Sequence, residues 1–186
     1  MNTIKTKADL LAVYESAKSN LVKRLVAGKI DAEKKDILCC GGTGCHASSS
    51  NVLIENLRAE IKAAGLESDV KVIQTGCFGF CAQGPIVKIM PDNVFYVQVT
   101  PEDAKEIVEK HIKGHQIVER LLYVEPTLKE AIHDYAKMPF YAKQHRISLR
   151  NCGLIDAESI EEYIAHEGYQ GLAKAVEVIN EYKARG

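Results

Sequence analysis

Four cysteines in two closely spaced pairs constrain the fold of this chain more than any other feature. Cys40 and Cys45 enclose four residues, three of them glycine, and Cys77 and Cys81 enclose three residues. The two pairs are separated by 31 residues. If all four thiols serve one centre, the fold has to bring two glycine-rich loops together from distant parts of the chain.

The residues around the cysteines predict two strands joined by a helix. Residues 34–39 and residues 70–74 have strand patterns, and each stretch leads into a cysteine pair. Between them, apolar residues at helical spacing predict a helix that begins at serines 48–50 and ends at Gly65. A strand–helix–strand unit implies parallel strands with a right-handed crossover. Both cysteine loops then follow the carboxyl ends of strands at one edge of the sheet.

The next segment completes an α/β domain of βαβββα order with a four-stranded mixed sheet. Residues 86–90 and 94–98 are strand-like and flank a turn sequence at residues 91–93, which is a hairpin pattern. Thr100 is expected to cap the last helix of the domain, with Pro101 at its first position. Two histidines at the end of this helix, His111 and His115, are expected on the surface.

Helices are predicted on both sides of this domain. Residues 7–27 are amphipathic, with Thr6 as a cap and Gly28 as a stop. The predicted division is an N-terminal helix (1–34), the central domain (35–125) and a helical extension (126–186).

The extension begins with a short aromatic linker over residues 138–144. Asp156 is then expected to cap a helix through residues 159–164, and a last helix is expected over about residues 169–183. Cys152 is predicted to be a buried structural thiol.

The chemistry that suits four paired thiols is the binding of an iron–sulfur cluster. Cysteine thiolates hold the iron atoms, and a [2Fe–2S] cluster takes four of them. The cluster with its thiolates is anionic, and backbone N–H groups in glycine-rich loops can approach the sulfurs closely. We therefore predict Cys40, Cys45, Cys77 and Cys81 as the ligands.

Two other interpretations of the cysteines stay open. The spacings also allow structural zinc in an assembly domain, although zinc pairs usually enclose two residues. A thiol redox sensor with Cys39 or Cys40 as the reactive group is the third alternative. Cys39 itself is expected to be a small buried apolar residue. His46 is expected to be a loop residue and not a ligand.

Composition excludes several other classes of protein. The 186 residues are 46% hydrophobic and 26% charged, which is typical of a globular protein. A net charge of −1 gives no electrostatic reason to bind nucleic acid or an anionic membrane. No apolar run approaches the roughly 20 residues that span a bilayer, and no signal-peptide core is present. Thiols kept for a metal are expected in a reducing cytoplasm.

The cysteine pattern resembles the thioredoxin-like [2Fe–2S] ferredoxin domain. The second loop reads Thr-Gly-Cys-Phe-Gly-Phe-Cys-Ala-Gln-Gly-Pro over residues 75–85. Together with residues 86–89 and 95–104 it is very similar to the domain at the N-terminus of the flavin subunit of NAD(P)-reducing and electron-bifurcating [FeFe]-hydrogenases. A related domain occurs in the small subunit of NADH dehydrogenase. The resemblance covers about residues 35–123 and implies a thioredoxin-like fold.

The resemblance also implies a setting for the domain. Residues 137–176 resemble the opening of the flavin-binding domain in the same subunits, which in that family leads to a glycine-rich FMN and NADH site. That site is not present here, so the chain is expected to be an N-terminal piece or a short form. The expected partners are other subunits of a hydrogenase or NADH dehydrogenase-type complex. FMN and NAD(P) are expected only in the parent subunit or complex, and a homo-oligomer is allowed.

Overall fold

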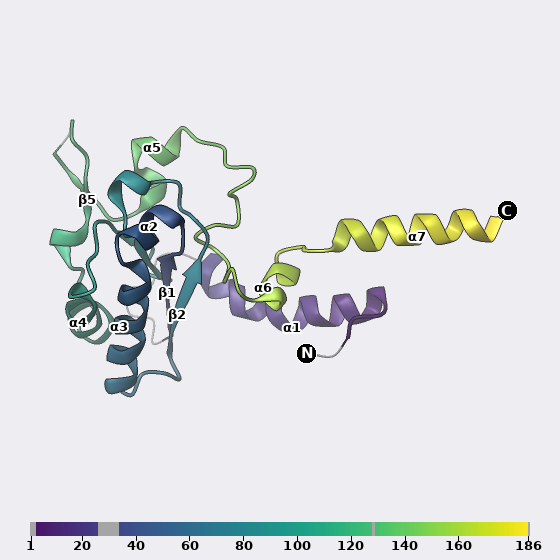
Figure 1. The fold of residues 1–186 in the computed structure, drawn as a ribbon, viewed down its shortest axis with the longest axis horizontal. Coiled ribbons are helices and arrows are strands. Elements are labelled where there is room, and N and C mark those ends of the chain that lie inside the picture. Colours follow the sequence, from purple (N-terminus) through teal and green to yellow (C-terminus); the bar gives the residue numbers. More distant parts are fainter. Residues whose placement is uncertain (1–2, 26–33, 128, 186) are drawn as a thin grey trace.

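A four-stranded mixed sheet forms the centre of the computed structural model, which describes residues 3–25, 34–127 and 129–185 (Figure 1). The spatial order of the strands is β2-β1-β3-β4. Strand β1 pairs in parallel with β2 and antiparallel with β3. The strands are β1 (Lys35–Cys40), β2 (Val70–Thr75), β3 (Val87–Met90) and β4 (Val94–Tyr96). The predicted βαβββα order and mixed sheet are confirmed.

Helices on one face of the sheet enclose the larger apolar core. Because side chains alternate along a strand, Ile37 and Cys39 of β1 point to this face. They are packed beneath α3 (Ser50–Ala63), α4 (Asp103–Glu106) and the π-helix η2 (Ile107–Lys113). Cys39 is fully buried there, and burial raises the pKa of its thiol to about 12. The prediction that Cys39 is a buried apolar residue is confirmed.

The opposite face of β1 presents Leu38 and Cys40 to a second apolar cluster. This cluster is completed by the C-terminal extension, through Met138 and Tyr141. The segment predicted as an aromatic linker is the 3₁₀ turn η4 (Tyr135–Lys137) and the short helix α5 (Pro139–Ala142). It packs on the sheet because its aromatic rings contact one another and Phe95 of β4.

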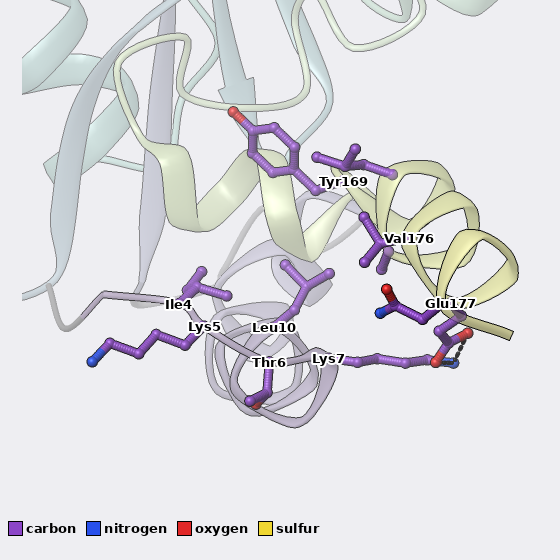
Figure 2. Close-up of a pocket in the computed structure, with 11 residues that line it drawn as sticks. Ile4, Lys5, Thr6, Lys7, Leu10, Tyr169, Val176 and Glu177 are labelled. Atoms are coloured by element: carbon purple, nitrogen blue, oxygen red, sulfur yellow. Dashed lines mark hydrogen bonds and ion pairs between the residues drawn. The ribbon is translucent and has the colours of Figure 1, made fainter. Parts of the chain in front are cut away.

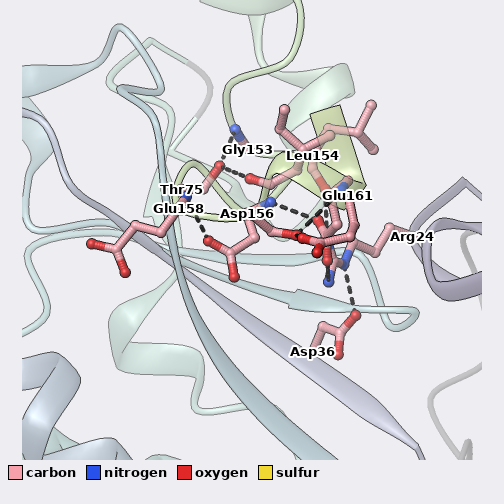
Figure 3. A network of polar contacts seen from close by, with 11 residues as sticks. Arg24, Asp36, Thr75, Gly153, Leu154, Asp156, Glu158 and Glu161 are labelled. Carbon is pink, nitrogen blue, oxygen red and sulfur yellow. Dashed lines mark hydrogen bonds and ion pairs between the residues drawn. The ribbon is translucent and has the colours of Figure 1, made fainter. Parts of the chain in front are cut away.

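Helix α1 (Lys7–Leu25) and helix α6 (Ile160–Ala165) pack against each other, and a buried arginine joins them to the sheet (Figure 3). Arg24 donates from Nε to Asp36 Oδ2 at 2.7 Å and from Nη2 to Glu162 Oε1 at 3.0 Å. Two carboxylates therefore neutralise one guanidinium that is almost inaccessible to solvent.

The helix boundaries follow the sequence with two corrections. The helix predicted to start at Pro101 with Thr100 as its cap begins at Asp103, and the Thr100 N–H and hydroxyl instead donate to Asp103 Oδ2 at 2.8 and 3.0 Å. Thr6 caps α1 as predicted, because its Oγ1 accepts from Asp9 N–H at 3.1 Å. The predicted stop at Gly28 lies outside the described residues. Helix α6 is capped by Ser159, whose Oγ accepts from Glu162 N–H at 3.2 Å, and not by Asp156 as predicted. The last helix, α7 (Gln170–Arg185), extends away from the sheet, and its Glu177 forms an ion pair with Lys7 of α1 (Figure 1).

The prediction of a surface position is wrong for His111. This residue of the π-helix is fully buried, and its Nε2 lies 2.7 Å from Asp92 Oδ2 and its Nδ1 2.6 Å from Tyr96 Oη. Lys35 also donates to Asp92 Oδ2. Helical periodicity does not predict this buried cluster of polar groups, because its other members come from β1, β4 and the turn after β3. His115 is exposed as predicted.

Shorter elements complete the structure. They are α2 (Thr43–Ala47), the 3₁₀ turns η1 (Cys81–Gln83) and η3 (Glu119–Leu121), and the two-stranded pair β5 (Tyr123–Val124) and β6 (Ala131–Ile132). A cavity of about 460 Å³ lies between the start of α1 and α7, lined by residues such as Leu10 and Val176 (Figure 2). No helix within the described ranges has the length and apolar character needed to cross a bilayer.

Candidate metal centre

The sheet register brings the two cysteine loops side by side. Cys40 at the end of β1 pairs with Thr75 at the end of β2, and Gly41 N–H donates to Thr75 C=O at 2.9 Å. Gly42 shows how close the thiols lie. A Cβ atom placed on it would be 3.1 Å from Cys77 Sγ and 3.6 Å from Cys40 Sγ.

The other two predicted ligands lie at the same place. A Cβ atom on Gly44 would be 3.5 Å from Cys81 Sγ, and one on Gly84 would be 2.7 Å from Cys45 Sγ. Each loop therefore provides a glycine that faces a cysteine of the other loop. Side chains at these glycines would occupy the space around the sulfurs, so the loops form a cradle for an inorganic group.

The second cysteine pair has the size that one tetrahedral metal requires. Cys77 Sγ lies 3.9 Å from Cys81 Sγ. Two thiolates at about 2.3 Å from one tetrahedral metal are roughly 3.8 Å apart. The Cys40 and Cys45 thiols are hydrogen-bonded to each other. Four thiols are the donor set that a [2Fe–2S] cluster takes, so the residues present fit this group.

Backbone N–H groups point at the sulfurs, as an anionic cluster requires. Gly79 donates to Cys77 Sγ at 3.3 Å. Gly42 and Phe78 donate to the sulfur of Cys40. Ile86 donates to the sulfur of Cys45 and was missed by the sequence reasoning, because it lies beyond both loops. Hydrogen bonds of this kind stabilise thiolate ligands and help to set the potential of a cluster.

Cys40 and Cys45, the cysteine pair of the first loop, are prepared for metal binding at neutral pH. A hydrogen bond from the Cys45 thiol lowers the pKa of Cys40 to about 6. The same bond raises the pKa of Cys45, so one proton is shared by the pair. The thiolate is the form that binds metal, and Cys40 provides it without a strong base.

Burial decreases from the first loop to the second. Cys40 and Cys45 are each 1% exposed, Cys77 is half-buried and Cys81 is exposed. The centre therefore lies just beneath the surface, and its accessible edge is the loop that carries Cys77 and Cys81.

The C-terminal extension covers part of this second loop. Tyr141 donates from its hydroxyl to Phe78 C=O at 3.1 Å, and the ring of Phe140 stacks on Phe80 with centroids 4.6 Å apart. Cys152 was expected to be buried, but it is half-buried and its sulfur lies against Gly76, the residue before Cys77. No local pattern predicts these contacts, because they join segments more than 50 residues apart.

Comparison with known proteins identifies the class to which this centre belongs. The sequence profile described as "Thioredoxin-like [2Fe-2S] ferredoxin" matches residues 29–112. A 2Fe–2S ferredoxin of Clostridium pasteurianum is 44% identical over 77 residues, which cover 41% of this chain and 76% of that protein. The chain therefore belongs to the thioredoxin-like [2Fe–2S] ferredoxin family. Membership implies a [2Fe–2S] cluster and a role in electron transfer.

Two further relatives show how the match is distributed. A 2Fe–2S ferredoxin of Aquifex aeolicus is 55% identical over 51 residues, 27% of this chain and 46% of that protein. The "NADP-reducing hydrogenase subunit HndC" of Solidesulfovibrio fructosivorans is 65% identical over 34 residues, 18% of this chain and 7% of that protein. A crystal structure of the Aquifex aeolicus thioredoxin-like [2Fe–2S] ferredoxin overlaps 50% of this chain and all of that one, with 36% identity and a TM-score of 0.46.

Proposed function

We propose that Cys40, Cys45, Cys77 and Cys81 hold the [2Fe–2S] cluster and that the chain relays single electrons through it. The observation that carries this proposal is the convergence of four thiols at the ends of β1 and β2, where Gly79 N–H donates to Cys77 Sγ and backbone amides lower the pKa of Cys40. The cluster supplies reversible one-electron chemistry when bound. The protein's part is to provide thiolates, to neutralise their charge with amide dipoles and to exclude water from the inner pair.

We further propose that the chain works inside an NAD(P)-linked hydrogenase or a related dehydrogenase complex. This is supported by the 65% identity to a subunit of an NADP-reducing hydrogenase over 34 residues. The extension beyond residue 126 also packs on the second cysteine loop, as a segment that leads from the cluster to a flavin domain would do. We assign FMN and NAD(P) to the parent subunit or complex. Electron bifurcation is one type of reaction proposed for that complex, and its proposed location is the cytoplasm.

Cluster analysis of the isolated protein tests the ligand assignment. Anaerobically purified protein should contain about two irons and two sulfides per chain and should give an EPR signal after reduction with dithionite. Replacing any of the four ligands by Ser should remove or change this signal. Cys39→Ser and Cys152→Ser are the matched controls and should retain it. Stoichiometric zinc without sulfide would overturn the proposal in favour of a structural zinc domain.

A further inference from the structure

Acidic residues are absent from all three segments that surround the candidate centre. The chain contains 25 Asp and Glu residues, yet none lies in residues 37–54, 70–91 or 135–155. The first two segments carry the cysteine loops. The third is the part of the extension that packs on the second loop.

The third segment carries four cations on its surface. Lys137, Lys143 and Arg150 are exposed, and Arg146 is partly buried. The Arg146 guanidinium lies over the rings of Tyr135 and Tyr141, 5.8 and 5.6 Å from their centroids. None of the four forms an ion pair with another described residue. Their positive field is therefore available to an outside partner.

Exposed apolar side chains alternate with these cations along the third segment, and two of them contact the loop of the accessible cysteine. Phe140, 39% exposed, stacks on Phe80, which precedes Cys81. Leu149, 40% exposed, is the side chain nearest to Gly79, where a Cβ atom would be 3.9 Å from it. Ile147 between them in sequence is 69% exposed. We call the exposed surface of Phe140, Lys143, Ile147, Leu149 and Arg150, together with Cys81, the cluster-edge face.

The anionic cluster accounts for only part of this pattern. Repulsion by the thiolates explains why carboxylates avoid the sulfurs, but it does not explain three exposed apolar side chains or the unpaired cations around them. An apolar centre with a charged rim is typical of a protein interface. Charged rims mainly steer association and select partners by the sign of their charge.

We propose that the cluster-edge face docks an acidic protein that carries a one-electron redox centre. Phe140, Ile147 and Leu149 would bury apolar surface in the complex, and Lys143 and Arg150 would pair with carboxylates of the partner. Cys81 is the exposed residue among the four proposed ligands, so this orientation places the partner next to the accessible edge of the site. The inference rests on the proposed function.

Binding of an acidic electron carrier tests the inference. The probe is a plant-type [2Fe–2S] ferredoxin of negative net charge with a fluorescent label, and its anisotropy is followed with the full chain at about 20 and 200 mM salt. We expect binding at low salt that weakens at high salt because the charges are screened. K143E/R150E should weaken binding at least tenfold and remove the salt dependence. I147S should weaken binding about fivefold and leave the salt dependence unchanged.

Controls separate this inference from the proposed function. K174E/K183E makes the same change in net charge on exposed positions of α7 and should bind like the wild type. Iron and sulfide content is measured for every variant first, and a chain without a cluster overturns the proposed function. With an intact cluster, three results overturn the docking proposal: absence of binding, equal weakening by both double variants, or sedimentation showing that I147S disrupts a dimer of this chain.

Discussion

Gly153 lies directly against the ring of Phe78. A Cβ atom on Gly153 would be 2.2 Å from Phe78 Cε1, and the backbone φ of Gly153 is +78°. The same region is fixed by Thr75, whose Oγ1 accepts from Gly153 N–H at 2.9 Å and donates to Ile155 C=O at 2.8 Å. Since Phe78 follows Cys77, one of the four proposed ligands, this contact connects the C-terminal extension to the proposed cluster loop.

Gly153→Ala should therefore destabilise the extension and the second loop together. The substitution combines a strained φ with a clash against the ring, and we expect a loss of about 1–3 kcal/mol in the free energy of unfolding. Urea unfolding of the cluster-loaded protein measures this loss. Gly171→Ala is the matched control, because nothing lies within 4 Å of its Cβ position in α7. Equal stability of the two variants would contradict the packing described for Gly153.

Gly84→Ala should impair cluster binding without unfolding the sheet. Its Cβ would lie 2.7 Å from Cys45 Sγ, which is closer than such atoms approach in proteins, so the sulfur has to move. We expect the iron and sulfide content to fall by half or more. Gly171→Ala is the matched control and should load normally, because nothing lies within 4 Å of its Cβ position in α7. Full loading of Gly84→Ala would show that this space is not part of the cluster cradle.

Asp92→Asn should destabilise the fold and leave the cluster intact. Asp92 Oδ2 accepts from both Lys35 Nζ and His111 Nε2 in a fully buried position. Removing a carboxylate from such a pair costs about 3–5 kcal/mol. Tyr96→Phe removes only the hydroxyl between His111 Nδ1 and Val118 N–H and should cost about 1–3 kcal/mol. Denaturation curves and the visible spectrum distinguish these effects. If folded Asp92→Asn lost the cluster, the buried ion pair at the start of β1 and the cysteine site at its end would not be independent.

Because of Lys88, the stability of the folded protein should change with pH in the alkaline range. Its side chain is buried beneath the ring of Tyr135, and desolvation lowers the pKa of Lys88 from 10.5 to about 8. Between pH 8 and 10.5 the unfolded chain binds this proton and the folded chain does not, so the contribution of Lys88 to stability rises with pH. Below pH 8 the full cost of the buried charge, about 3 kcal/mol, is present.

The difference between wild type and Lys88→Met isolates this residue from other alkaline groups. We expect Lys88→Met to be more stable than wild type at pH 7, and the difference to shrink as the pH is raised to 10.5. Thermal unfolding across this range measures the trend. A difference that is constant with pH would show that Lys88 is not desolvated.

Much of the central domain could be predicted from local patterns. The strand–helix–strand unit, the hairpin after it and the cap at Thr6 depend on residues close together in the chain, and all of them are found. The domain boundaries at residues 34 and 125 stay predictions. The assignment of the four cysteine ligands also stays a prediction. His111 was misplaced because its helical position gives no information about Asp92 and Tyr96, which approach from the sheet.

The sequence by itself determined the cysteine pairs, the glycines between them and the alternation that sends Cys39 and Cys40 to opposite faces of β1. Local spacing is sufficient for these features, since each depends on the geometry of one strand or one loop. Only the tertiary structure decided that Ile86 donates to Cys45 and that residues 135–155 cover the second loop. Those contacts join residues that are distant in the chain, and their energies depend on how the whole sheet is packed.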